Sequence, residues 1–109
     1  MPEQNKPVKV LILASGDLWA GAEAVVYQLT KGLHETRGIE VMAVFLNEGM
    51  LAGLCREAGV KTLVIDESRH HFFSIMKELS KIVRSFRPDI IHSHRSKENV
   101  LAALTRHSM

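Results

Sequence analysis

The chain has 109 residues, of which 46% are hydrophobic and 24% charged, as is usual for a single globular domain spanning residues 1–109. Its formal net charge of +2 is too small for a general nucleic-acid-binding protein, so no nucleic acid is expected among its partners. No apolar run is long enough to cross a membrane, the polar N-terminus lacks the pattern of a secretory signal, and Cys55 has no second cysteine to pair with. These features predict a cytoplasmic location.

Apolar, β-branched segments alternate along the chain with segments of helical periodicity. Strands are expected at residues 8–14, 40–46, 61–66 and 90–93, and helices at 22–36, 50–58, 70–86 and 96–106. The apolar face of the first helix is expected to comprise Ala22, Val25, Val26, Leu29 and Leu33. Three glycines have predicted roles: close approach of the first helix to the sheet (Gly32), its C-terminal cap (Gly38), and the end of the second helix (Gly59).

Regular alternation of strands and helices, joined by short connections, predicts an α/β fold with a parallel sheet covered on both faces. Right-handed crossovers then favour a doubly wound, Rossmann-like, three-layer αβα arrangement with strand order 3-2-1-4. Ligands of such folds bind at the carboxyl ends of the strands, where the winding reverses. That point lies between the first and fourth strands, so residues 15–23 and 92–99 are expected to form the site.

The first of these segments has a glycine directly before a helix. Gly16 and Gly21 have the spacing of the outer glycines of a phosphate loop, but Ala22 and Glu23 stand where Lys and Ser or Thr are required, which excludes that loop. Gly21 and Ala22 still place free backbone N–H groups at a helix N-terminus, a general seat for anions. Glu23 either complements the helix dipole or contacts a ligand. Trp19 either lines a sugar site or packs across the strand ends.

The second segment contains two histidines, His92 and His94, whose side chains share a face because they lie two apart on one strand. They are interpreted as a metal pair, a structural pair, or a pair of which one member contacts ligand. No third ligand has a supportive spacing, so no metal is expected. His94 lies nearer the strand tip and is the candidate catalytic residue, while Arg95 and Asn99, at the start of the next helix, are candidates for binding anions and hydroxyls.

Basic residues are concentrated in the last third of the chain. From Arg69 onward there are eight basic and three acidic residues, and Lys77, Lys81 and Arg84 share the polar face of the third helix. This is either a solvated helix face or a surface for an anionic partner such as phospholipid headgroups. The second interpretation predicts a peripheral position on the inner face of the membrane.

Three motifs together resemble the N-terminal domain of the retaining group 1 glycosyltransferases, which adopt the GT-B fold. Ala20-Gly21-Ala22-Glu23 is similar to the family's Gly-Gly-x-Glu loop, with Ala20 in place of the first glycine. Gly49-Met50-Leu51 with Ala58-Gly59-Val60 resembles its second helix. Arg87-Pro88-Asp89-Ile90-Ile91-His92-Ser93-His94 is similar to its R-P-D-(I/V)-(I/V)-H-x-H strand. The resemblance covers essentially the whole chain.

The resemblance implies transfer of a hexose, with retention and without a metal, from a nucleotide-sugar donor to a glycan or lipid-linked acceptor. Gly21 would approach the donor diphosphate or the transferred sugar, and His94 would face the reacting sugar. The family's second domain carries most of the nucleotide-binding surface and is not within these 109 residues. The chain is therefore expected to be a truncated GT-B N-terminal domain, inactive on its own and without a cofactor.

Two further expectations concern partners. The outer edge of the fourth strand, at residues 90–93, would offer unpaired backbone groups, which predicts self-association into a homo-oligomer. The alternative to an enzyme fragment is a non-catalytic α/β module that binds a phosphorylated ligand or a partner protein.

Overall fold

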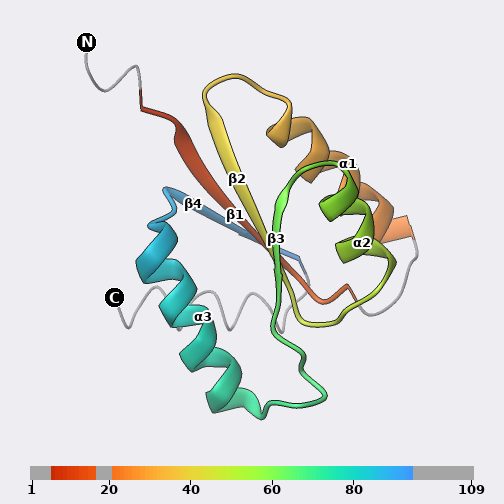
Figure 1. Cartoon of the computed structure of the whole chain (residues 1–109), viewed down its shortest axis with the longest axis vertical. Coiled ribbons are helices and arrows are strands. Elements are labelled where there is room, and N and C mark those ends of the chain that lie inside the picture. The colour runs from red at the N-terminus through yellow and green to blue at the C-terminus, as the bar shows by residue number, and fades with distance from the viewer. Residues whose placement is uncertain (1–5, 17–20, 95–109) are drawn as a thin grey trace.

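The computed structural model describes residues 6–16 and 21–94. Within them, seven elements follow one another with strict alternation of strand and helix (Figure 1). They are β1 (Val8–Ala14), α1 (Gly21–His34), β2 (Ile39–Phe45), α2 (Met50–Glu57), β3 (Lys61–Val64), α3 (Phe72–Phe86) and β4 (Ile90–Ser93). The predicted helix at 96–106 lies outside the described residues.

The four strands form one parallel sheet in the order β3-β2-β1-β4, which confirms the predicted fold class and strand order. β1 is central and pairs along its whole length with β2, from Val8 opposite Ile39 to Ala14 opposite Phe45. On its other side, Val10 to Leu13 pair with Ile90 to Ser93. The winding reverses at β1, so the loops that follow β1 and β4 emerge at the same edge of the sheet.

Both faces of the sheet are buried, which explains why β1 and β2 are apolar almost throughout. Alternate residues of these strands pack against α3 on one face, where its side chains Ile75, Leu79, Val83 and Phe86 complete a cluster with Leu11, Leu13, Met42 and Val44. The intervening residues pack on the other face against α1 and α2 through Val26, Leu51, Ala52 and Cys55. The result is three layers, with α3 apart from the α1 and α2 pair (Figure 1).

Several predicted details of α1 are wrong. Val25 and Leu29 are 65% and 38% exposed, because the buried face of α1 is formed by Glu23, Val26 and Thr30 instead. Gly32 is exposed, and a Cβ there would meet nothing within 4 Å, so this glycine brings α1 no closer to the sheet. Gly38 lies four residues beyond the end of α1 and forms the turn into β2, with a φ of +87°.

The predicted end of α2 is confirmed. Gly59 has a φ of +87°, and the N–H of Val60 donates to the carbonyl of Cys55 to close the last turn. β3 is two residues shorter than predicted, although the N–H groups of Ile65 and Glu67 still donate to the carbonyls of Phe45 and Leu46.

α3 has a defined start and end. His71 precedes it and accepts the N–H of Ser74 on Nδ1, so a histidine fills the N-cap position. Arg87 follows it in the left-handed conformation, with a φ of 56°, before Pro88. The helix therefore spans Phe72–Phe86 and starts two residues later than predicted.

The connection from α3 to β4 is fixed to the start of β1. The N–H of Asp89 donates to the carbonyl of Lys9, and the Asp89 carboxylate accepts the N–H of Lys9, both at 2.8 Å. The Lys9 ammonium donates to the carbonyl of Phe86 at 3.1 Å, at the negative end of the α3 dipole. These contacts set the register of β4 beside β1, and with it the position of the histidines on β4.

Candidate functional site

The candidate site is the carboxyl edge of the sheet at the junction of β1 and β4. β1 ends at Ala14 and is followed by the buried residues Ser15 and Gly16, while α1 begins at Gly21. Gly21 and Ala22 are exposed in the first turn of α1. A Cβ on Gly21 would meet no described atom within 4 Å.

Glu23 lies in the same turn but points to the opposite side. It is only 2% exposed and shares the sheet-facing side of α1 with Val26 and Thr30. Acidic residues in the first turn of a helix complement the positive end of its dipole. Because it is buried, Glu23 is better placed to fix the start of α1 than to meet a ligand from solvent.

His92 and His94 follow one another along the end of β4. His92 is exposed and lies opposite Ile12, so it projects from the sheet face that α1 and α2 cover. His94 is half-buried just beyond the strand, and its N–H donates to the carbonyl of Leu13 at 3.0 Å. The β1–β4 ladder thus continues to His94 and holds it beside the end of β1.

A hydrogen-bond network joins the loops after β1, β2 and β3. The Asn47 side-chain amide donates to the carbonyl and hydroxyl of Ser15, each at 3.1 Å, and to the Glu67 carboxylate at 2.6 Å. The N–H of Leu46 donates to the carbonyls of Ala14 and Ser15. This network ties the loop that leads to α1 to the rest of the carboxyl edge.

Two glycines allow the first two loops to approach each other closely. Gly16 has a φ of +70°, and a Cβ there would meet the Asn47 carbonyl oxygen and Phe45 at 3.4 Å. A Cβ on Gly49 would lie 3.1 Å from the Gly16 carbonyl oxygen, closer than such contacts ordinarily come. The glycine of the Gly49-Met50-Leu51 motif therefore serves the packing of the β1 loop.

The loop from β3 to α3 is held by its own side chains. The N–H and hydroxyl of Ser68 donate to one oxygen of Asp66, at 2.9 and 2.6 Å, and these bonds lower the pKa of Asp66. Nδ1 of His70 lies 2.9 Å from the Asp66 carbonyl. The loop is thereby fixed before the His71 cap begins α3.

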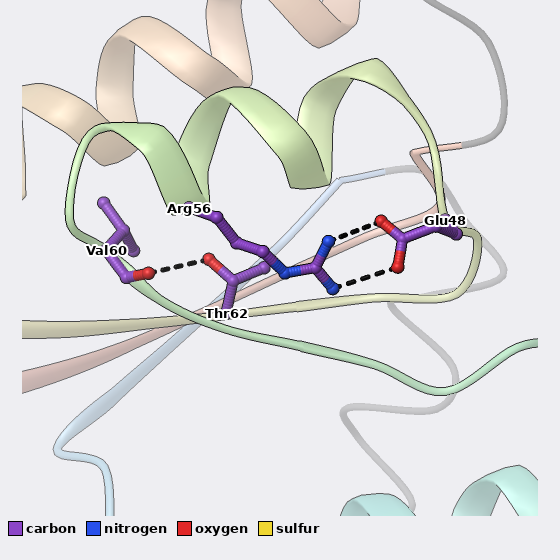
Figure 2. Close-up of polar contacts among 4 residues, drawn as sticks. All are labelled: Glu48, Arg56, Val60 and Thr62. Atoms are coloured by element: carbon purple, nitrogen blue, oxygen red, sulfur yellow. Dashed lines mark hydrogen bonds and ion pairs between the residues drawn. The ribbon is translucent and has the colours of Figure 1, made fainter.

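A bidentate ion pair closes α2 onto the loop before it (Figure 2). The two terminal nitrogens of Arg56 donate to the two carboxylate oxygens of Glu48 at 2.6 and 3.0 Å, and this bonding lowers the pKa of Glu48. Nearby, the Thr62 hydroxyl donates to the carbonyl of Val60 at the start of β3. The ion pair lies at the surface, with side-chain exposures of 45% for Arg56 and 59% for Glu48.

Replacing Glu48 by glutamine is expected to lower the free energy of unfolding by only about 0.2–0.5 kcal/mol, because exposed pairs are screened by water and salt. Because the pKa of Glu48 is lowered in the folded chain, the ion pair stabilises the fold at pH values above the ordinary pKa of glutamate. This stabilisation is lost as the pH falls through the lowered pKa of Glu48. Urea unfolding at neutral pH, at low and high salt, measures the difference. Glu57→Gln, which changes the carboxylate next to Arg56 in the sequence, is the control. Equal losses of unfolding free energy in both variants would show that the ion pair contributes nothing.

Sequence reasoning located part of this edge. Gly21, Ala22, Glu23, His92 and His94 are placed as described above, whereas Trp19, Arg95 and Asn99 lie outside the described residues. Ser15 lies within the predicted segment 15–23, whereas Asn47 and Glu67 were missed. Each follows a strand end at the carboxyl edge, so the rule that singled out the β1 and β4 loops would have found them if it had been applied to β2 and β3.

Among residues 6–16 and 21–94, no three His, Cys, Asp or Glu side chains are grouped so that they could hold a metal ion. None of the helices in this part of the chain is long and apolar enough to cross a membrane. The single Cys55 is fully buried between α2 and the sheet, and burial raises the pKa of its thiol to about 11. The thiol is therefore an apolar packing group and lies away from the candidate site.

Comparison with known protein families matches the chain to Glycosyltransferase Family 4 over residues 19–108. No curated protein and no solved structure matches the chain. The matched region begins at Trp19, before α1, and extends past β4, so it includes the N-terminus of α1 and both His92 and His94. The chain belongs to Glycosyltransferase Family 4, the N-terminal domain family of the group 1 glycosyltransferases of GT-B fold.

Proposed function

We propose that the chain forms the acceptor-side wall of a glycosyltransferase active site, at which a hexose passes with retention from a nucleotide-sugar donor to a glycan or lipid-linked acceptor. The observation that carries this proposal is that three features lie at the edge where the winding reverses: the end of β1, the exposed first residues of α1, and His94 just beyond β4. The family membership supports the transferase chemistry, and the geometry supports the location.

The N-terminus of α1 is the proposed binding site for the negatively charged diphosphate of the donor. Gly21 and Ala22 are exposed there, and their backbone N–H groups belong to the first turn, where helices have no internal acceptor for them. Among residues 6–16 and 21–94, no atom would lie within 4 Å of a Cβ on Gly21. A glycine at this position allows a diphosphate or sugar to approach the backbone closely.

His94 is the proposed contact to the reacting sugar. Its backbone N–H donates to the Leu13 carbonyl near the end of β1, and the residue is partly exposed. A ring nitrogen placed in this way can donate to a sugar hydroxyl or a phosphate oxygen. Trp19, His92, Arg95 and Asn99 are the further residues that we propose for the binding surface. No metal ion enters the proposed site, because the helix N-terminus supplies the positive potential.

The nucleotide is expected to be held mainly by a second domain, as the family resemblance implies. We therefore propose that the 109-residue chain binds donor weakly and gives no turnover. Transfer of a labelled sugar from donor to acceptor by the chain alone would contradict this proposal.

Donor binding by the chain tests the site directly. Titration of the isotope-labelled chain with UDP-glucose and GDP-mannose, followed by NMR, is expected to shift the amide signals of Gly21, Ala22 and His94. His94→Ala is expected to weaken binding about fivefold, the effect of losing one hydrogen bond of about 1 kcal/mol. His34→Ala, which removes an exposed histidine at the far end of α1, is the matched control.

Two results would contradict the proposed function. Changes of NMR amide signals confined to another surface would show that the nucleotide-sugar binds elsewhere. Equal binding of inorganic phosphate and nucleotide-sugar would favour the non-catalytic module that recognises a phosphorylated ligand.

A further inference from the structure

The strand β3 forms one edge of the sheet, where it pairs with β2 alone. The N–H of Ile65 donates to the carbonyl of Phe45 in β2, and the backbone groups of alternate residues point to opposite sides of a strand. The N–H and C=O groups of Thr62 and Val64 therefore point away from β2. Among residues 6–16 and 21–94, no further backbone group pairs with them, so they are available to another strand.

A shallow hollow of about 200 Å³ lies beside this edge, on the face of the sheet that α3 covers. Leu63 is 37% exposed there, although Val44, its partner in β2, is fully buried beneath α3. The residues that line the hollow come from β2, β3 and α3 and are Met42, Lys61, Leu63, Lys81, Ile82 and Ser85. We call these six residues, together with the outward backbone groups of Thr62 and Val64, the β3 edge site.

Two lysines give the β3 edge site a positive charge. Lys61 is exposed and forms no ion pair within residues 6–16 and 21–94. Lys81 contacts Glu78 at 3.4 Å, but the two side chains are 60% and 43% exposed, so this pair is weak. None of the six residues that line the hollow is acidic. The site therefore suits a ligand that brings negative charge.

The same lysines decide which kind of strand pairs at this edge. Proteins limit unwanted pairing of edge strands by keeping them short and by placing lysines on them, and β3 has four residues and begins with Lys61. A second copy of this edge would bring two more lysines and no acidic lining residue, so the two copies would repel each other. An acidic strand would instead place carboxylates beside Lys61 and Lys81, and opposite charges on neighbouring strands stabilise their pairing.

We propose that the β3 edge site binds an extended, acidic peptide segment of another protein, which adds to the sheet as a further strand beside β3. The backbone of the peptide would pair with the N–H and C=O groups of Thr62 and Val64. Alternate residues of a strand share a face, so an acidic side chain beside Lys61 is accompanied, two residues away, by an apolar side chain beside Leu63. The apolar side chain would cover the hollow, and the carboxylate would lie within reach of the Lys61 ammonium.

The β3 edge site lies away from the candidate site, so this proposal does not rest on the proposed function. Lys61 is the first residue of β3, while Ile82 and Ser85 lie near the end of α3, which leads to the start of β4. The hollow therefore lies toward the amino edge of the parallel sheet, whereas the candidate site is at the carboxyl edge between β1 and β4 (Figure 1). A peptide bound at β3 leaves the N-terminus of α1 accessible.

Titration of the isotope-labelled chain with a synthetic peptide, followed by NMR, tests the proposal. The probe is Glu-Thr-Val-Thr-Glu-Thr-Val with blocked ends, in which the acidic and apolar residues share one face. At saturating peptide, hydrogen exchange of the Thr62 and Val64 amides is expected to slow, whereas the Leu63 amide, which points to β2, should change little. Lys61→Ala combined with Lys81→Ala is expected to weaken binding about fivefold, since each exposed ion pair contributes about twofold to threefold.

Matched controls separate strand addition from a general attraction between charges. Lys6→Ala with Lys31→Ala removes two cations that lie before β1 and on α1, and binding should not change. Leu63→Ser is expected to weaken binding several-fold, whereas Val25→Ser, which removes an exposed apolar side chain from α1, should not. Two altered peptides complete the set: one has lysine in place of glutamate, and the other is N-methylated at the central valine and threonine. Both are expected to bind much more weakly. Circular dichroism establishes that each variant of the chain is folded.

Several results would overturn the proposal. One is the absence of binding at millimolar peptide, and another is binding that leaves the exchange of the Thr62 and Val64 amides unchanged. Equal binding of the N-methylated peptide would show that no backbone pairing occurs. Equal binding of the lysine peptide, or an equal loss in the control lysine pair, would show that Lys61 and Lys81 do not recognise the acidic residues.

Discussion

Replacing Asp89 by alanine is expected to lower the free energy of unfolding by about 1.5–3 kcal/mol, the range for a hydrogen bond to a charged group. The Asp89 carboxylate accepts the N–H of Lys9 at 2.8 Å, in the place where the ladder between β1 and β4 would otherwise need a backbone carbonyl. Without it, that N–H loses its partner, and the backbone bond from the Asp89 N–H to the Lys9 carbonyl is the attachment of β4 to β1 that remains at this point. The effect is large for a surface carboxylate because it acts on the register of the sheet.

Urea unfolding followed by circular dichroism measures this loss. Asp89→Asn keeps an acceptor oxygen without the charge, so it is expected to be destabilised less than the alanine variant. Glu35→Ala, which removes an exposed carboxylate in the turn after α1, is the control and should change little. If Asp89→Ala were no more destabilising than Glu35→Ala, the carboxylate would not anchor β4.

The fold was predictable because its signals are local. Strands buried on both faces are expected to be apolar, and β1 and β2 are apolar apart from Lys9 and Glu40 near their starts. α3 has a clear helical periodicity and ends where Pro88 follows. With alternating elements, the right-handed crossover rule leaves few topologies, and the predicted order 3-2-1-4 is the one found.

The details that failed depend on how α1 is rotated about its axis. Val25 and Val26 are adjacent and equally apolar, yet one is 65% exposed and the other 2%. The sequence alone favours both for the core, because hydrophobicity does not reveal that Glu23 and Thr30 are on the buried side. Thr30 can be buried because its hydroxyl donates to the carbonyl of Val26 at 2.7 Å, a contact that depends on the helix already being in place.

The motifs that resemble those of the family could be recognised in the sequence, but the structural roles of several of their residues could not be predicted from it. Asp89 anchors β4 to the start of β1, and Gly49 makes room for the Gly16 carbonyl. These roles require contacts between segments distant in the sequence, so no local pattern shows them. The same holds for the bonds that join Asn47 to Ser15 and Glu67.

Replacing Gly16 by alanine is expected to destabilise the chain by about 1–2 kcal/mol, because its φ of +70° is costly for a residue with a Cβ. The new methyl group would also press on Phe45 and the Asn47 carbonyl, each 3.4 Å away. Gly53→Ala is the matched control within α2, where a Cβ would meet nothing within 4 Å. Alanine favours the helix there, so this control should gain up to about 1 kcal/mol.

Comparing the Gly16→Ala and Gly53→Ala variants distinguishes an effect on the conformation of the β1 loop from an effect on the overall stability of the domain. If Gly16→Ala displaces the loop that leads into α1, donor binding should weaken by more than the loss of folded chain accounts for, because the helix N-terminus and His94 would no longer face one ligand. Urea unfolding and the NMR titration with nucleotide-sugars, performed on both variants, measure the two effects. If the Gly16→Ala chain is destabilised but binds donor normally, the proposed anion-binding site at Gly21 does not depend on the packing of Gly16 against Gly49. In that case α1 alone positions the site.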